Sequence, residues 1–307
     1  MIRFNSDYLE GAHPRILQRL AETNLAQTPG YGEDRFCEQA RNTIRRLCDA
    51  QDADVQFLVG GTQTNATVLA AALRPYQGVI SADSGHIAVH ETGAIEATGH
   101  KVYAMPGVDG KLTPDAVRRA VQDHQTGVEE HMVLPKLVYV SDSTELGTIY
   151  TRAELEALSE TCKELGLLFY LDGARLGAAL TAEGNDLQPE DFARLCDAFY
   201  VGGTKNAQLF GEAMIIVNDA LKPFFRNVMK QRGGMLAKGR LLGVQFEAMF
   251  RDDLWLQTAR HANELAQKLS AGMKELGIEF YMESPTNQLF PVLPDEVVEK
   301  LKNGFAF

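Results

Sequence analysis

The sequence predicts an α/β fold in which a mostly parallel sheet is covered by helices, followed by a smaller C-terminal α/β domain. Short runs of β-branched or aromatic residues alternate with helical patterns over most of the chain, and repeated β-then-α units form parallel sheets. Residues 167–171 are continuously apolar, as expected of a strand inside such a sheet. Ligands bind to these sheets at the carboxyl ends of the strands, so the strand-to-helix junctions are candidate sites.

The elements follow one another in a regular order. The expected strands are residues 55–59, 78–82, 101–104, 137–141, 167–171, 198–201 and 213–217. Helices are expected over residues 63–74 and 86–97, from Pro114 after the cap Thr113, and after the capping box of Thr151 and Glu154. The link between the last two strands is short and contains no helix, which favours an antiparallel pair.

The pattern changes after about residue 241. Helical periodicity covers residues 242–275, strand-like segments cover 278–282 and 288–293, and Pro294 opens another helix. We therefore expect a large ligand-binding domain of residues 1–240 and a small domain of residues 241–307. The alternating aromatic residues 304–307 look like the first half of a strand, so the small domain is expected to be incomplete; a docked apolar tail is the alternative.

Composition excludes several classes of protein. The 307 residues carry a net charge of −11, which argues against nucleic-acid and acidic-membrane partners. There is no signal-like N-terminus and no apolar run of bilayer length. The cysteines have no zinc-site spacing and are expected to be reduced, buried thiols of a cytoplasmic protein: Cys37, Cys48, Cys162 and Cys196.

Two junctions carry groups suited to an anion and to a cation. Residues 60–65, GGTQTN, join a strand to a helix; Gly61 lets the backbone approach an anion, and the helix N-terminus and the hydroxyls of Thr62 and Thr64 can bind it. A tight turn with a capped helix is the alternative. Asp172 follows an apolar strand, where a charge needs a partner such as a protonated pyridine nitrogen. Arg175 could bind a substrate carboxylate, or form a structural ion pair with Asp172.

Two further junctions carry a nucleophile and a base. Lys205 follows a buried strand and two glycines, where a lysine amine can become nucleophilic; Thr204 could reach a phosphate, and a surface lysine is the alternative. His86 could stack on a cofactor ring and move a proton. A capping or core histidine, or a metal site with His90 four residues on, are the alternatives.

These groups share one edge of the predicted sheet. A phosphate loop, a strand-end Asp172 and a strand-end Lys205 are together what a pyridoxal 5′-phosphate (PLP) site requires. The sequence therefore predicts a PLP enzyme without a metal site.

At these motifs the chain resembles the threonine aldolase / aromatic amino acid β-eliminating lyase family, and within it the low-specificity L-threonine aldolases. The matching segments are residues 5–7, 31–34, GGTQTN at 60–65, 84–101, 143–148, LDGARLGAAL at 171–180 and GGTKN at 202–206 with Gly211. The resemblance implies the aspartate-aminotransferase-like fold (fold type I). It also implies cleavage of L-threonine or L-allo-threonine to glycine and acetaldehyde. Other PLP reactions, such as β-elimination or transamination, and a PLP-binding homologue with impaired catalysis remain alternatives.

The resemblance also implies residue roles. Lys205 would hold PLP as a Schiff base, Asp172 would bond its ring nitrogen, His86 would stack on the ring and act as base, and Gly61 and Thr62 would hold the phosphate. Ser6 and Arg175 would face the substrate carboxylate, Tyr31 would approach the site, and Arg232 or Lys238 would contact the phosphate across the interface of a homodimer or homotetramer. Family members continue a few tens of residues further and usually supply a second arginine there.

Overall fold

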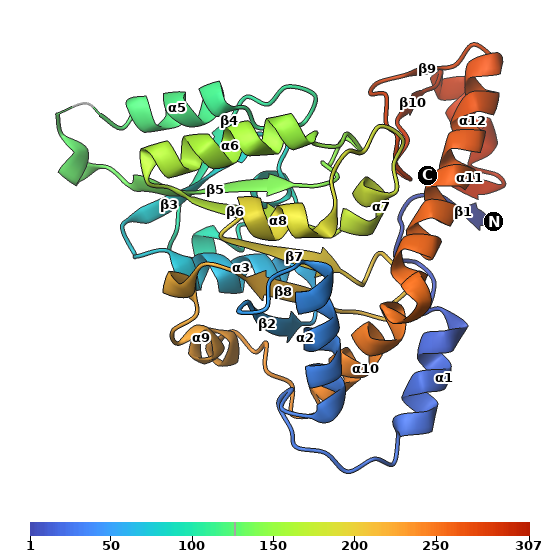
Figure 1. Cartoon of the computed structure of the whole chain (residues 1–307). Coiled ribbons are helices and arrows are strands. Elements are labelled where there is room, and N and C mark those ends of the chain that lie inside the picture. The colour runs from blue at the N-terminus through green and yellow to red at the C-terminus, as the bar shows by residue number, and fades with distance from the viewer. Residues whose placement is uncertain (126) are drawn as a thin grey trace.

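A seven-stranded sheet forms the centre of the computed structural model, which describes residues 1–125 and 127–307 (Figure 1). The strand order is β2-β8-β7-β6-β5-β3-β4, and only β8 runs antiparallel to its neighbours. The strands are β2 (Asp54–Leu58), β3 (Gln77–Ala82), β4 (Val102–Met105), β5 (Leu134–Ser141), β6 (Leu168–Asp172), β7 (Ala198–Gly202) and β8 (Glu212–Ile216). The predicted fold class and the antiparallel β7–β8 pair are confirmed.

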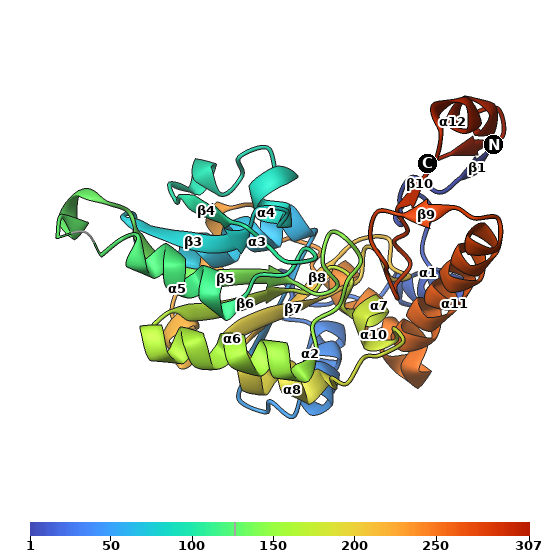
Figure 2. The same ribbon diagram turned by 90° about the horizontal axis from the view of Figure 1, so that it is seen from above.

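Helices cover both faces of this sheet (Figure 2). One face packs against α1 (Pro14–Thr23), α2 (Arg35–Leu47), α5 (Pro114–Gln122), α6 (Arg152–Leu165) and α8 (Pro189–Leu195). The other packs against α3 (Gly61–Ala72) and α9 (Phe225–Gln231). The predicted caps are present: Thr113 accepts from Ala116 N, and Thr151 and Glu154 form the capping box.

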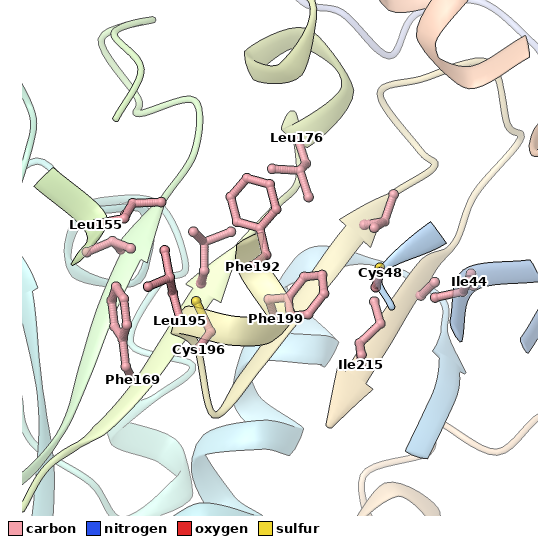
Figure 3. Packing of buried hydrophobic residues seen from close by; sticks show 14 of the residues in the cluster. Ile44, Cys48, Leu155, Phe169, Leu176, Phe192, Leu195, Cys196, Phe199 and Ile215 are labelled. Atoms are coloured by element: carbon pink, nitrogen blue, oxygen red, sulfur yellow. The ribbon is translucent and has the colours of Figure 1, made fainter. Parts of the chain in front are cut away.

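Strand residues alternate between these two faces. Phe169 and Phe199 of β6 and β7 belong to the core beneath α8, where Phe192 packs 5.9 Å from Phe199 between ring centroids (Figure 3). Tyr170 and Tyr200, one position further along each strand, belong to the opposite cluster. Asp172 shares the face of Tyr170, because side chains two residues apart in a strand point the same way.

The predicted helix over residues 86–97 is wrong. Helix α4 is a single turn, His86–Val89, and a separate 3-10 turn follows at Glu96–Thr98. Thr92 and Gly93 between them have φ values of 53° and 72°. This left-handed backbone cannot continue a right-handed helix. The chain thus reverses direction soon after His86.

The chain from about residue 254 onward packs beside the sheet rather than over it (Figures 1 and 2). The predicted periodicity of residues 242–275 is divided between α10 (Arg240–Met249) and α11 (Leu254–Glu275), with left-handed residues at Asp252 and Asp253. A short antiparallel pair follows, β9 (Glu279–Phe280) with β10 (Pro291–Val292), then α12 (Asp295–Leu301). Because α10 packs on α1 and α2, the domain boundary at residue 240 stays a prediction.

The two ends of the chain lie side by side. Strand β11 (Phe305–Ala306) pairs in parallel with β1 (Ile2–Arg3), and the label N lies close to the label C in both ribbon views (Figures 1 and 2). The strand-like character predicted for residues 304–307 is confirmed.

Two features bear on the predictions from composition, the state of the cysteines and the hydropathy of the helices. All four cysteines are buried and free, as predicted. Among the described residues, no helix has the length and apolar character needed to span a bilayer.

Candidate active site

A cavity of about 270 Å³ lies at the carboxyl ends of the strands. It brings together side chains and backbone from all four predicted junctions. Its lining includes Gly61, Thr62, His86, Asp172, Arg175, Thr204 and Lys205, with Tyr8, Gly60, Ser143, Glu145, Tyr200 and Glu212 among the others. The sequence-predicted amine and carboxylate therefore share one cavity.

Four neutral donors surround the Asp172 carboxylate. Its Oδ2 accepts from Tyr139 Oη at 2.6 Å and from Asn65 Nδ2 at 3.0 Å. Its Oδ1 accepts from the Ala174 backbone at 3.0 Å and from Tyr200 Oη. Asp172 is 4% exposed. Donors of this kind stabilise a buried carboxylate in place of water, so the charge is held at the floor of the cavity.

The turns that carry Asp172 and Lys205 are in backbone contact. Gly202 N donates to Gly173 O at 2.9 Å. A Cβ on Gly173 would lie 1.9 Å from Tyr200 O, and a Cβ on Gly202 would lie 2.4 Å from Ala174 O. Such separations are far below contact distance, so both positions require glycine.

His86 is bound at one ring nitrogen by a buried carboxylate. Its Nδ1 lies 2.8 Å from Glu91 Oε1, which also accepts from Asn65 Nδ2 at 2.7 Å. The hydrogen bond to Glu91 raises the pKa of His86 above its ordinary value, against the effect of burial. Glu145 accepts from the His86 backbone N at 2.9 Å. The imidazole is thus oriented with Nε2 as the nitrogen left for a ligand.

The N-terminus of α3 lines the cavity through Gly60, Gly61 and Thr62. Gly60 is the N-cap and provides no side chain, and a Cβ there would meet nothing within 4 Å. Thr62 is exposed. Thr64, however, is buried and donates its hydroxyl to Gly60 O at 3.0 Å. The prediction that Thr64 offers a donor to an anion is therefore wrong, because its hydroxyl stabilises its own helix.

Thr204 also has a partner within the chain. Its hydroxyl donates to Glu212 Oε1 at 2.8 Å and accepts from Gly211 N at 3.0 Å. The contact predicted between Thr204 and a phosphate stays a prediction.

Arg175 is held by Asp7 and not by Asp172. Arg175 Nε and Nη2 donate to the two Asp7 oxygens at 2.7 and 3.1 Å, and Asn287 Nδ2 donates to Asp7 at 3.2 Å. Burial by itself raises the pKa of Asp7, but the charges of Arg175 and Lys205 hold it below its usual range. The sequence alternative of an Asp172–Arg175 ion pair is replaced by this tie to the N-terminal segment.

A second cavity of about 350 Å³ adjoins the first. The two share Tyr8, Arg175, Thr204 and Lys205 in their linings. The second cavity also contacts α11 through Thr258 and Ala262. Lys205 therefore borders both the cavity that contains Asp172 and the cavity that contains Asp7.

Four predicted residues lie outside both linings. Ser6 precedes Asp7 and has a buried Oγ for which the described residues provide no partner. Tyr31 is 46% exposed beneath the Lys230 ammonium, which lies 4.7 Å from its ring centroid. Arg232 and Lys238 lie in the segment after α9. Their predicted roles depend on a neighbouring subunit and stay predictions.

Several residues of the site were not predicted from the sequence. They are Asp7, Asn65, Glu91, Tyr139, Tyr200 and Glu212. The tyrosines had a usable signal, because each places a hydroxyl two positions before a strand-end residue in an otherwise apolar strand. Among the described residues, no group of three or more His, Cys, Asp or Glu side chains could hold a metal ion.

Comparisons with known proteins agree over nearly the whole chain. The model of the family described as Beta-eliminating lyase matches residues 4–295. Low specificity L-threonine aldolases of Pseudomonas sp. (strain NCIMB 10558) and Pseudomonas aeruginosa are 32% and 33% identical, covering 99% of this chain and 88% of each relative.

Solved structures give the same relationship. The Leishmania major threonine aldolase superposes with a TM-score of 0.97 at 49% identity, covering 99% of this chain and 88% of that one. Thermus thermophilus aspartate aminotransferase, at 17% identity with a TM-score of 0.75, covers 100% of this chain and 82% of its own, and shares the fold. By the extent of the family match and the identity to these relatives, the chain belongs to the beta-eliminating lyase family.

Proposed function

We propose that the chain is a PLP-dependent aldehyde-lyase that cleaves L-threonine or L-allo-threonine to glycine and acetaldehyde. The observation that carries the proposal is that Lys205, Asp172 and the N-terminus of α3 line one cavity. The relatives named threonine aldolases, which match 99% of this chain, supply the substrate class.

The residues fit PLP in chemistry and in arrangement. Lys205 would hold its aldehyde carbon, Asp172 its ring nitrogen, and Gly61 and Thr62 its phosphate, while His86 would stack on the ring. A carboxylate has about four acceptor positions, and all four at Asp172 have donors. A ring N–H would be a further donor to this carboxylate. When bound, PLP supplies the electron sink for breaking a bond at the substrate Cα.

The chain itself would supply binding and proton transfer. Arg175 would bind the substrate carboxylate in bidentate fashion in place of Asp7. His86, with Nδ1 held by Glu91, would take the β-hydroxyl proton at Nε2 or through a water that it orients. Asp172 would bond the ring nitrogen and keep a positive charge on the bound ring. The Lys205 amine would take the place of the product at the aldehyde carbon and so release it.

Quaternary structure belongs to the same proposal. We infer a homodimer or homotetramer in which Tyr31 and Arg232 of one subunit approach the cavity of the next, because both lie outside the cavity of their own chain. A cytoplasmic location is part of this proposal and agrees with four free buried thiols.

The test is Lys205→Ala. The variant is expected to purify without the PLP absorbance band, to give no borohydride-trapped adduct, and to lose acetaldehyde release from threonine. Full activity in this variant would end the proposal. Wild-type protein that releases pyruvate and ammonia from β-substituted amino acids, and no acetaldehyde from threonine, would assign β-elimination instead.

A further inference from the structure

Glu212 occupies a position fixed by two neighbouring strands. It is the first residue of β8, where it pairs with Gly202 at the end of β7 and with Leu58 at the end of β2. The loop after β7 carries Lys205, and the loop after β2 leads into the N-terminus of α3. Because β8 runs antiparallel to both strands, its first residue lies at the edge where their last residues lie. The carboxyl therefore sits between the lysine loop and the anion-binding loop.

One oxygen of this carboxyl has a partner and the other does not. Glu212 is 3% exposed and lines the cavity with Lys205. Its Oε1 accepts from Thr204 Oγ1 at 2.8 Å, whereas Oε2 is buried and has no hydrogen-bond partner among the described residues. An unpaired buried carboxyl oxygen is costly. A cation or donor in the cavity is the partner that would remove this cost.

Lys205 is the cation available to it. The titratable groups that act on Glu212 are Lys205 on the loop after β7 and Asp172 at the end of β6, and Glu212 in turn acts on Tyr170 and Tyr200. Helix α3 and Leu58 of β2 contribute no titratable side chain.

The remaining neighbours offer no competing cation. The α10 side chains next to Gly211 are Leu242 and Phe246. Arg175, which also lines the cavity, is bound by both Asp7 oxygens, and the His86 ring is bound by Glu91. Asp172 is negative and already has its donors.

We propose that the Glu212 carboxyl is the proton partner of Lys205, which it holds as an ammonium and from which it takes the proton when the amine is released. This inference rests on the proposed function. The Glu212 carboxylate stabilises the Lys205 ammonium while the lysine has no covalent partner. To react, the ammonium gives one proton to the carboxylate; the neutral amine then adds to the aldehyde carbon of PLP, and one water leaves.

The pKa of the Glu212 carboxyl supports this pairing. Burial raises its pKa to about 8, although the Thr204 hydrogen bond and the Lys205 charge act in the opposite direction. A carboxyl with this pKa gains or loses its proton within the pH range in which capture of PLP can be followed. Its ionisation favours the ammonium and moves release of the amine to higher pH.

The experiment follows capture of PLP by the full-length protein after the cofactor has been removed with hydroxylamine, with folding checked by circular dichroism. The rate of capture is measured against pH by absorbance, and borohydride trapping with peptide mapping identifies Lys205. Glu212→Gln keeps an acceptor for Thr204 but cannot ionise. Its midpoint is expected about one pH unit or more below wild type, with about tenfold faster capture below both midpoints.

Two further variants make the result specific. Glu145→Gln neutralises the other glutamate that lines the cavity, which is bonded to Ser141 and the His86 backbone, and is expected to leave the midpoint in place. Thr204→Val removes the hydrogen bond that lowers the Glu212 pKa, so it should also move the midpoint to lower pH. If Glu212→Gln does not fold, this variant tests the pairing in its place.

The outcomes separate the two proposals. Midpoints that are the same in wild type and Glu212→Gln, or in wild type and Thr204→Val if the first variant does not fold, overturn the pairing. An equal shift in Glu145→Gln also overturns it, because any cavity carboxyl would then suffice. Wild-type protein that captures no PLP on Lys205 overturns the proposed function itself.

Discussion

The Asp172 carboxylate is buried without an ion pair to any side chain that the structure describes. Its donors are two tyrosine hydroxyls, an asparagine amide and one backbone N–H, all of which are neutral. Isolated burial of a carboxylate costs several kcal/mol, and neutral donors offset this cost without cancelling the charge. The negative charge is therefore preserved for a positively charged ligand atom in the cavity.

Asp172→Asn tests this arrangement. The substitution keeps the size of the side chain and removes its charge, so PLP should bind more weakly and turnover should fall by at least about a hundredfold, because a charge placed for the transition state is lost. Steady-state acetaldehyde release and PLP absorbance measure both effects. Turnover within about tenfold of wild type would contradict the role given to Asp172.

Glu91→Gln tests the orientation and acidity of His86. The Glu91 hydrogen bond raises the pKa of His86, and a base must be unprotonated to act. The acid limb of the pH–rate profile should therefore lie above the ordinary value of about 6.5 in wild type and move to lower pH in the variant. An acid limb that stays in place would show that His86 does not limit the reaction.

At the scale of single elements, caps at helix ends are local and measurable. Thr151 accepts from Glu154 N, and the Glu154 side chain accepts from Thr151 N at 2.8 Å. Thr151→Ala should lower the free energy of unfolding by about 1 kcal/mol, and Thr151→Ser, which keeps the hydroxyl, should stay close to wild type. Urea unfolding followed by circular dichroism measures both; equal stability of all three proteins would exclude the cap as a source of stability.

Strands and helices that bury one continuous apolar run could be predicted from the sequence. Elements that end because single residues adopt a left-handed backbone could not. Strand β6 has the apolar residues that a central parallel strand needs. Helix α4 ends after one turn because Thr92 and Gly93 adopt left-handed backbone, which the helical pattern of residues 86–97 did not reveal. Asp172 and Lys205 could be placed near strand ends because the apolar strands before them could be predicted.

The remainder of the site depends on contacts between distant segments. Asp7 meets Arg175 from 168 residues away, and Asn65 meets Asp172 from 107 residues away. Local periodicity carries no information about such pairs. The parallel pairing of β1 with β11, between the two ends of the chain, is hidden in the same way.

At the scale of the whole molecule, Asn206 joins the active-site loop to the C-terminal helices. It follows Lys205 directly, donates to Trp255 O at 2.8 Å, and accepts from Thr258 Oγ1 at 2.7 Å. Trp255 is the single tryptophan of the chain and is buried. Its fluorescence therefore reports how α11 is docked beside the loop.

Asn206→Ala should loosen this docking. Loss of buried hydrogen bonds of this kind lowers stability by about 1–3 kcal/mol, so urea unfolding monitored by tryptophan emission should shift to lower urea. Asn185→Ala, which removes hydrogen bonds to Leu180 O and Leu187 O and none to Trp255, provides the comparison. If Asn206→Ala leaves the native emission and the rate of PLP capture unchanged, α11 and the loop are independent.

The contact between Gly173 and Gly202 limits how this enzyme can vary. Two consecutive turns are joined through main-chain atoms, with no room for a β-carbon on either glycine. The separation between the acid at one turn and the amine at the other is thus built into the polypeptide backbone and cannot be retuned by exchanging side chains. Natural or engineered changes in substrate preference must therefore arise around this rigid pair, in the segments contributed by Asp7, His86 and α11.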